Sequence, residues 1–222
     1  MKTLVLFSGG IDSTTLLAKA VRERESVEAI TIQYGQRHEE QELRTSRKIS
    51  RYYGVDQNIV DLKNIFTSDR NSVLLHKEKE MPHVTYQEIK GVSPTYVPLR
   101  NPVFIVVSAA IGMMKEYDEL WVGVHAEDAI NDAYPDCRED VIGSLASAIH
   151  IGSYYKMRVK APLQYMLKKD ILEYGEKLDV PYELTYSCYK GEELHCGECP
   201  TCKARRKAFI EAGIEDPTEY QK

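Results

Sequence analysis

Near its amino terminus the chain reads Thr3-Leu4-Val5-Leu6-Phe7-Ser8-Gly9-Gly10-Ile11-Asp12-Ser13-Thr14-Thr15, and the rest of the fold is built on this segment. Mostly apolar, β-prone residues lead into Ser-Gly-Gly, and helix formers begin after Asp12. The pattern predicts a strand, a tight glycine loop and a helix. A helix start has free backbone N–H groups and partial positive charge, and Gly9 and Gly10 let the main chain approach a ligand closely. The segment is therefore expected to bind an anion such as phosphate.

The loop differs from the two commonest nucleotide-binding loops. It has neither the lysine of a Walker loop nor the three spaced glycines of a dinucleotide fold. It resembles instead the Ser-Gly-Gly-x-Asp-Ser loop of the ATP pyrophosphatases, which bind the β- and γ-phosphates of ATP while a nucleophile attacks the α-phosphorus. The resemblance implies adenylation, with Mg²⁺ beside the phosphates and an ATP-binding set of Phe7, Ser8, Gly9, Gly10, Ile11, Asp12, Ser13 and Thr14. The alternative is a glycine turn without a chemical role.

The composition is ordinary for a soluble globular protein. The 222 residues are 43% hydrophobic and 28% charged, which suits one large domain or a domain with a small appendage. No apolar run approaches the roughly 20 residues of a membrane span, and no secretory hydrophobic region follows Met1-Lys2. A cytoplasmic protein is therefore expected. The net charge of −5, with dispersed Lys and Arg, disfavours nucleic acid as a partner.

Apolar strands alternate with helix-length segments. Further strands are expected at residues 27–33, 57–62, 119–124 and 158–160, and helices at residues 11–24, 39–53, 103–117, 138–150, 168–178 and 203–212. Because a helical crossover joins parallel strands, the alternation predicts an α/β fold with an open parallel sheet of about five strands flanked by helices. Residues 63–95 show no sustained period, so a lid, a partner surface and a disordered insertion are the alternatives there.

Polar side chains follow the expected strands, at the edge where open α/β sheets bind their ligands. Tyr34-Gly35-Gln36-Arg37-His38 comes after the second strand, and a solvated helix start is the alternative reading. Gly123 allows a close approach, and the polar residues 125–138 after it favour a pocket for a ring-bearing substrate over an acidic surface loop. From these segments the candidate substrate-binding residues are Tyr34, Gln36, Arg37, His38, Gly123, Tyr134, Asp136 and Arg138.

Two basic residues stand at expected helix starts. Arg100 precedes Asn101-Pro102 at the start of an apolar, buried helix. Lys168, followed by Lys169, opens a later helix where acidic residues are usual. This indicates a phosphate contact by one of the two lysines, although a solvated lysine is the alternative. Together with Asp12 and Ser13, Arg100 and Lys168 form the candidate catalytic set.

The carboxy-terminal cysteines predict a metal site. Cys188, Cys196, Cys199 and Cys202 supply four thiolates, three of them at C-x-x-C spacing, which suits tetrahedral zinc; iron–sulfur ligation is the alternative. Four protein ligands leave no open position, so the zinc is expected to be structural. The remaining Cys137 is not expected to bind metal. The predicted organisation is an ATP-binding α/β domain over residues 1–180 and a small zinc-binding subdomain over residues 181–222.

The combined motifs resemble the 7-cyano-7-deazaguanine synthases over nearly the whole chain. The resemblance rests on Phe7-Ser8-Gly9-Gly10-Ile11-Asp12-Ser13, Tyr34-Gly35-Gln36-Arg37-His38, Val97-Pro98-x-Arg100-Asn101, Gly123-Val124, Tyr134-Pro135-Asp136-Cys137-Arg138, Pro162-Leu163 with Lys168, Ser187-Cys188-Tyr189 and the run from Cys196 to Arg205. It implies an adenine-nucleotide-hydrolase-like fold, a zinc site and commonly a homodimer.

The implied reaction uses ATP to convert 7-carboxy-7-deazaguanine and ammonia to the nitrile preQ0, on the way to queuosine or archaeosine. Arg100 and Lys168 would contact phosphate or carboxylate, and Tyr134 and Asp136 the deazaguanine edge. The chain departs from the pattern at Leu99, where a small residue is expected, and in a longer segment at residues 124–134. The rival readings are another adenylating ligase of the superfamily, such as one that transfers a deazaguanine, and a tRNA-modifying enzyme with a zinc ribbon.

Overall fold

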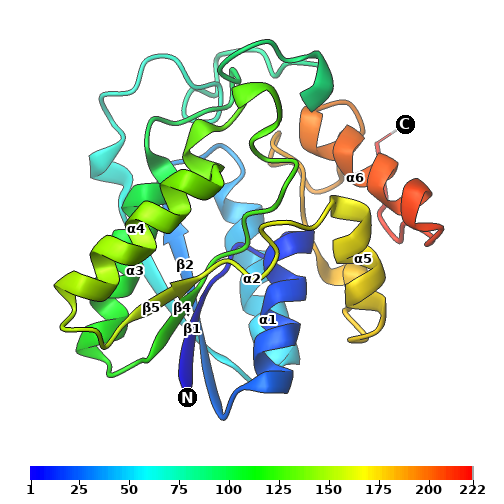
Figure 1. Ribbon diagram of the computed structural model, residues 1–222. Helices are drawn as coiled ribbons and strands as arrows, with labels where there is room; N and C mark the ends of the chain where they lie inside the picture. The colour runs from blue at the N-terminus through cyan, green and yellow to red at the C-terminus, as the bar shows by residue number, and fades with distance from the viewer. Residues whose placement is uncertain (222) are drawn as a thin grey trace.

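The computed structural model describes residues 1–221, and its centre is a five-stranded parallel sheet in the order β3-β2-β1-β4-β5 (Figure 1). The strands are β1 (Lys2–Leu6), β2 (Ser26–Gln33), β3 (Asp56–Asp61), β4 (Glu119–Trp121) and β5 (Arg158–Lys160). The predicted α/β fold is confirmed, although the ladder of β4 is shorter than the expected strand at residues 119–124. In the middle of the sheet, Leu4 pairs with Glu28 of β2 and Leu120 of β4. The chain order runs outward from β1 on both sides, so the crevice beyond the ends of β1 and β4 is the expected ligand site.

Helices cover both faces of the sheet. α1 (Ile11–Glu23), α2 (Glu39–Tyr52) and α5 (Lys168–Glu176) share one buried apolar cluster, whereas α3 (Arg100–Met114) and α4 (Glu139–Gly152) contribute to the other. α6 (Pro200–Ala212) packs against α5, as Figure 1 shows. α3 begins at Arg100, earlier than the predicted residue 103. Pro102 therefore lies in the first turn of the helix, where its missing N–H group costs no intrahelical hydrogen bond.

The segment at residues 63–95 crosses the molecule above the carboxyl ends of the strands (Figure 1). It contains two short 3₁₀ helices, Lys63–Ile65 and Tyr86–Glu88. Leu74 is fully buried in the apolar core, and its carbonyl accepts a hydrogen bond from the Arg37 N–H at 2.8 Å. The segment therefore packs over the ligand edge of the sheet. Of the three alternatives, this arrangement agrees with a lid and not with a disordered insertion.

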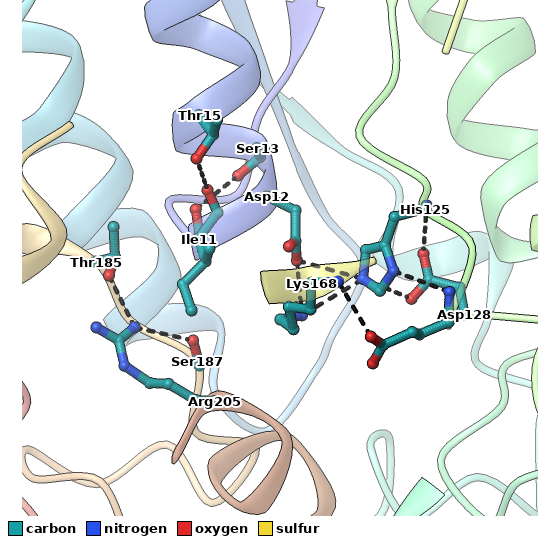
Figure 2. A network of polar contacts seen from close by, with 12 residues as sticks. Ile11, Asp12, Ser13, Thr15, His125, Asp128, Lys168, Thr185, Ser187 and Arg205 are labelled. Carbon is teal, nitrogen blue, oxygen red and sulfur yellow. Dashed lines mark hydrogen bonds and ion pairs between the residues drawn. The ribbon is translucent and has the colours of Figure 1, made fainter. Parts of the chain in front are cut away.

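A buried arginine fixes the carboxy-terminal segment to the body of the fold. Arg205 of α6 has no exposed surface, and its guanidinium donates to Thr185 Oγ1 at 2.8 Å and Ser187 Oγ at 3.2 Å (Figure 2). It also donates to the Tyr182 carbonyl and to Asp216, each at 3.2 Å. A buried charge is tolerated only when it is paired and hydrogen-bonded, so these contacts hold residues 182–187 against α6. The same segment reaches the phosphate loop, because the Tyr186 N–H donates to the Gly9 carbonyl at 3.0 Å.

Within residues 1–221, no helix has the length and apolar character needed to cross a bilayer.

The packing of α5 against α1 requires that Gly175 has no side chain. A Cβ at Gly175 would lie 1.8 Å from Tyr182 Oη, which bonds Thr15 Oγ1 and the Leu172 carbonyl, each at 3.2 Å. We expect Gly175→Ala to destabilise the protein by about 1–3 kcal/mol, the usual range for overpacking. The measurement is the free energy of unfolding in urea.

Gly143→Ala is the matched control. Gly143 lies inside α4, and an added Cβ there meets nothing within 4 Å. The same substitution should therefore stabilise the protein, by up to about 1 kcal/mol from helix propensity. Equal effects of the two substitutions would contradict the packing argument.

Candidate active site

A cavity of about 270 Å³ lies at the carboxyl ends of β1, β2 and β4. It gathers residues from widely separated parts of the chain. The predicted site residues that line it are Phe7, Ser8, Gly10, Ile11, Asp12, Ser13, Tyr34, His38, Gly123, Arg100, Tyr134 and Lys168. One space therefore contains both the loop expected to bind phosphate and residues expected to bind the substrate ring.

The phosphate loop presents hydroxyl groups at the start of α1. The Ser13 hydroxyl lies 3.2 Å from the Ser8 hydroxyl and accepts the Ser8 N–H at 3.3 Å. Gly9 has φ +86°, and a Cβ there would come within 2.9 Å of Thr45 in α2. Glycine is thus required for the turn and for its contact with α2. Gly9 and Thr14, both predicted to bind ATP, do not line the cavity, and Thr14 is fully buried.

Four charged or titratable side chains meet at one end of the cavity (Figure 2). Lys168 Nζ donates to Asp12 Oδ2 at 2.9 Å and lies 3.4 Å from His125 Nε2. His125 Nδ1 lies 3.2 Å from the Glu127 N–H, and His125 Nε2 lies 3.3 Å from Asp128 Oδ1. The candidate catalytic residues Asp12 and Lys168, 156 positions apart, are therefore in direct contact.

The charges of this network stabilise one another. Burial by itself would raise the pKa of the Asp12 carboxyl, but Lys168 and His125 outweigh that effect and hold it below its usual value. Burial would likewise lower the pKa of Lys168, but Asp12 and Asp128 hold it above its usual value. Asp12 Oδ1 is buried and has no hydrogen-bond partner among the described residues. An anionic oxygen with a free lone pair beside a phosphate loop suits a ligand of Mg²⁺.

Aromatic rings form the other end of the cavity. Tyr34 packs on Phe104 with ring centroids 5.2 Å apart, and Tyr86 on Tyr134 at 5.9 Å. Arg100 donates to Tyr34 Oη at 3.0 Å, which fixes its guanidinium beside the rings. Burial raises the pKa of Tyr34 to about 12, so its hydroxyl keeps its proton.

Four predicted substrate residues lie outside the cavity lining. Gln36 accepts the Tyr34 N–H at 3.1 Å, and Arg37 donates to the Lys79 carbonyl at 3.1 Å. Asp136 Oδ2 accepts the Asn101 N–H at 3.0 Å, at the start of α3. Arg138 is exposed and pairs with Asp140 at 2.8 Å. These contacts support neighbouring elements and leave the prediction of direct substrate binding by the four residues untested.

Sequence reasoning did not single out several residues of the site. His125 and Asp128 stand three positions apart in the polar stretch that follows β4, and this spacing is the signal that could have identified them. Tyr86 lies in the segment without a period, and Tyr189 stands next to a cysteine assigned to metal. Further side chains of the cavity lining that were not assigned to the site include Glu42, Asn101, Phe104, Tyr186, Ser187 and Thr201.

The four carboxy-terminal cysteines form a second site. All are buried free thiols, and the Sγ atoms of Cys188, Cys196, Cys199 and Cys202 lie within 4.8 Å of one another. Tetrahedral zinc with Zn–S bonds of about 2.3 Å sets sulfurs roughly 3.8 Å apart, and the Cys196 to Cys202 separation is 3.9 Å. The cluster can therefore hold a metal ion.

The main chain supports these sulfurs, because the Cys196 N–H donates to Cys188 Sγ at 3.4 Å and the Cys199 N–H to Cys196 Sγ at 3.3 Å. Cys137 lies apart from the cluster, where it accepts from Asn101 Nδ2 at 3.0 Å.

The chain resembles known proteins in sequence and in fold. Its residues 2–213 match the family of queuosine biosynthesis protein QueC. The 7-cyano-7-deazaguanine synthase of Thermoplasma volcanium is 42% identical over 228 residues, covering 100% of this chain and 91% of that protein. The enzyme of the same name from Aquifex aeolicus is 40% identical over 212 residues, covering 93% and 95%.

The U34-tRNA thiolase NcsA from Methanococcus maripaludis is 14% identical with a TM-score of 0.53, over 96% of this chain and 67% of that chain. This likeness shows a shared fold. The sequence matches show the family as well as the fold, because they extend over almost every element that builds the cavity and the cysteine cluster. The chain belongs to the QueC family of queuosine biosynthesis proteins.

Proposed function

We propose that this protein is an ATP-dependent ligase that converts 7-carboxy-7-deazaguanine and ammonia to 7-cyano-7-deazaguanine. Relatives that match its full length bear the name of that synthase. The observation that carries the proposal is that the phosphate loop and the aromatic rings line one cavity. A ring-bearing acid held against the rings can thus present its carboxylate to a nucleotide held by the loop.

The reaction follows from the weakness of a carboxylate as an acyl donor. An oxygen of the substrate carboxylate attacks the α-phosphorus of ATP and pyrophosphate leaves, which gives an acyl-adenylate. Ammonia attacks the acyl carbon, AMP leaves, and the amide forms. The amide oxygen then attacks the α-phosphorus of a second ATP and pyrophosphate leaves. Loss of both amide protons and of AMP gives the nitrile.

The residues at the loop end of the cavity would stabilise the charge that builds up at each attack. Ser8, Ser13 and the first N–H groups of α1 donate to the departing pyrophosphate, and Lys168 supplies a positive charge. Lys168 is held in place by Asp12 at 2.9 Å. Mg²⁺, when bound, would neutralise phosphate charge, and Asp12 is the residue suited to hold it. Arg100, fixed by Tyr34, would bind the substrate carboxylate or its phosphate.

The metal in the cysteine cluster is proposed to be Zn²⁺ with a structural role. Four thiolates complete its coordination, so no position is left to activate water or substrate. The proposed functional division is residues 1–180 for ATP and residues 181–222 for the metal. Thr201, between two of the cysteines, lines the cavity, so the metal would hold one wall of the site in place.

A cytoplasmic homodimer is also proposed. Five free thiols suit a reducing compartment. Apolar side chains are exposed around the carboxyl ends of α3 and α4: Met113, Met114, Ile151, Tyr154 and Tyr155. Clustered exposed apolar surface of this kind marks an interface in many proteins.

Incubation with ATP, Mg²⁺, ammonium and 7-carboxy-7-deazaguanine should yield preQ0 with two AMP and two pyrophosphate for each nitrile, as measured by mass spectrometry. Release of ADP and phosphate would contradict the adenylation route. Asp12→Asn should lose turnover by roughly 10²-fold or more, while it keeps its fold and its metal.

Loss of a metal ligand should act through folding. We expect Cys199→Ser to lower zinc content, thermal stability and soluble yield together, while the folded fraction keeps near-normal ATP affinity. Cys137→Ala is the control and should keep one zinc per chain. A Cys199→Ser protein that is fully stable but inactive would show that the metal takes part in the chemistry.

Light scattering should report a particle of twice the chain mass of 25.4 kDa. The double substitution Ile151→Asp and Tyr154→Asp should give a monomer, because it places charge in the proposed apolar contact. Ile210→Asp is the matched control, since Ile210 is 79% exposed on α6, away from that surface. Dissociation by the control alone would place the interface elsewhere.

A further inference from the structure

Glu42 is a carboxylate of the cavity that the proposed reaction does not use. It lies in the first turn of α2, three positions before Thr45, the residue that contacts Gly9 of the phosphate loop. Residues three apart share a helix face, so Glu42 stands about one helical turn from the loop. Its side chain is 19% exposed.

The neighbours of Glu42 hold its carboxylate without neutralising it. The side-chain amide of Gln36 donates to Oε2. Oε1 is 3.7 Å from Nε2 of His38, whose ring packs on Tyr189 with centroids 5.1 Å apart. Burial, followed by Arg100, lowers the pKa of His38 to about 3, so the ring is neutral near pH 7. Each carboxylate oxygen therefore keeps a lone pair for a ligand.

The walls around Glu42 suit a flat ring. Tyr34, Tyr86, Tyr134, Tyr189 and Phe104 all line the same cavity. Aromatic side chains stack on nucleobase rings whatever their identity, so they supply affinity for a base but do not choose among bases. Selection then needs a polar group at the ring edge.

A carboxylate selects guanine-type rings by its two adjacent acceptors. The amino-pyrimidinone edge of guanine presents the N1–H and the 2-amino N–H side by side, and both can donate to one carboxylate. Adenine presents a donor next to a ring-nitrogen acceptor, which a carboxylate repels. We propose that Glu42 is the specificity residue that binds the N1–H and 2-amino edge of the deazaguanine substrate. This inference deepens the proposed function and rests on it for the identity of the substrate.

The other carboxylates near the cavity are engaged. Asp136, which the sequence favoured for this role, does not line the cavity and accepts from the main chain of α3. Asp128 is bonded to His125, and Asp12 to Lys168. Burial raises the pKa of Glu42 to about 7 against the opposing effects of Gln36 and Arg100, and two N–H donors from a ligand would favour its ionised form.

The test uses ring probes that need no turnover. Binding of 7-deazaguanine and of 7-deazahypoxanthine, which lacks the 2-amino group, is measured by calorimetry at pH 8 for the native protein, Glu42→Gln and Glu40→Gln. The native protein should prefer 7-deazaguanine by about tenfold or more, as expected for one hydrogen bond to a charged group. Glu42→Gln should lose that preference and bind 7-deazaguanine roughly 10- to 100-fold more weakly, with ATP affinity and melting temperature unchanged. Glu40, exposed in the first turn of α2, is the matched control and should behave as native.

Each outcome decides the inference. Retained preference in Glu42→Gln overturns it, and so does an equal loss in Glu40→Gln. Weakened ATP binding in Glu42→Gln would mean that Glu42 serves the nucleotide, which also overturns it. A native protein that prefers 7-deazaguanine but makes no nitrile would refute the proposed function and leave the edge assignment standing, so the two failures are distinguishable.

Discussion

The ion pair between Asp12 and Lys168 is the interaction on which the site depends. It joins the loop after β1 to the first residue of α5, and it lies against the end of β4 through His125. The side chains of Lys168 and Asp12 are only 15% and 22% exposed, so each charge stabilises the other, and Asp128 adds to the stabilisation of Lys168. The pair therefore fixes the relative position of three elements as well as the charge of the site.

The sequence predicted what local patterning controls. The order strand, glycine loop, helix at residues 3–15 depends on neighbours along the chain, and the structure has β1, the loop and α1 there. The four cysteines were recognisable for a similar reason, because metal ligation leaves a short spacing. The pairing of Asp12 with Lys168 could only be suspected, since no local rule links residues 156 positions apart.

Other features of the site could not be predicted from the sequence, because they depend on contacts between residues far apart in the chain. The sequence offers both Asp136 and Glu42 as carboxylates near the ligand edge and does not distinguish them. Only the structure shows that the Asp136 carboxylate accepts a hydrogen bond from the main-chain N–H of Asn101 in α3. Tyr86 reaches the cavity from a segment with no period at all. Leu99, which departs from the small residue expected there, has φ +51° and ψ +27°. That left-handed conformation is natural for glycine and strained for leucine, so the pattern expected at this position has a backbone cause.

The contact between Gly9 and Tyr186 has a consequence for synthesis of the protein. The Tyr186 N–H donates to the Gly9 carbonyl at 3.0 Å, so the far end of the chain closes the loop formed by its beginning. On the ribosome, the first strand and its loop emerge long before residue 186, and at ~5–20 residues per second the interval is roughly 10–40 s. During that time β2 can pair early with one edge of β1, but the other edge stays open until β4 emerges. A nascent chain therefore carries an exposed edge of its central strand until β4 has emerged, and an incomplete nucleotide site until Tyr186 has emerged late in translation.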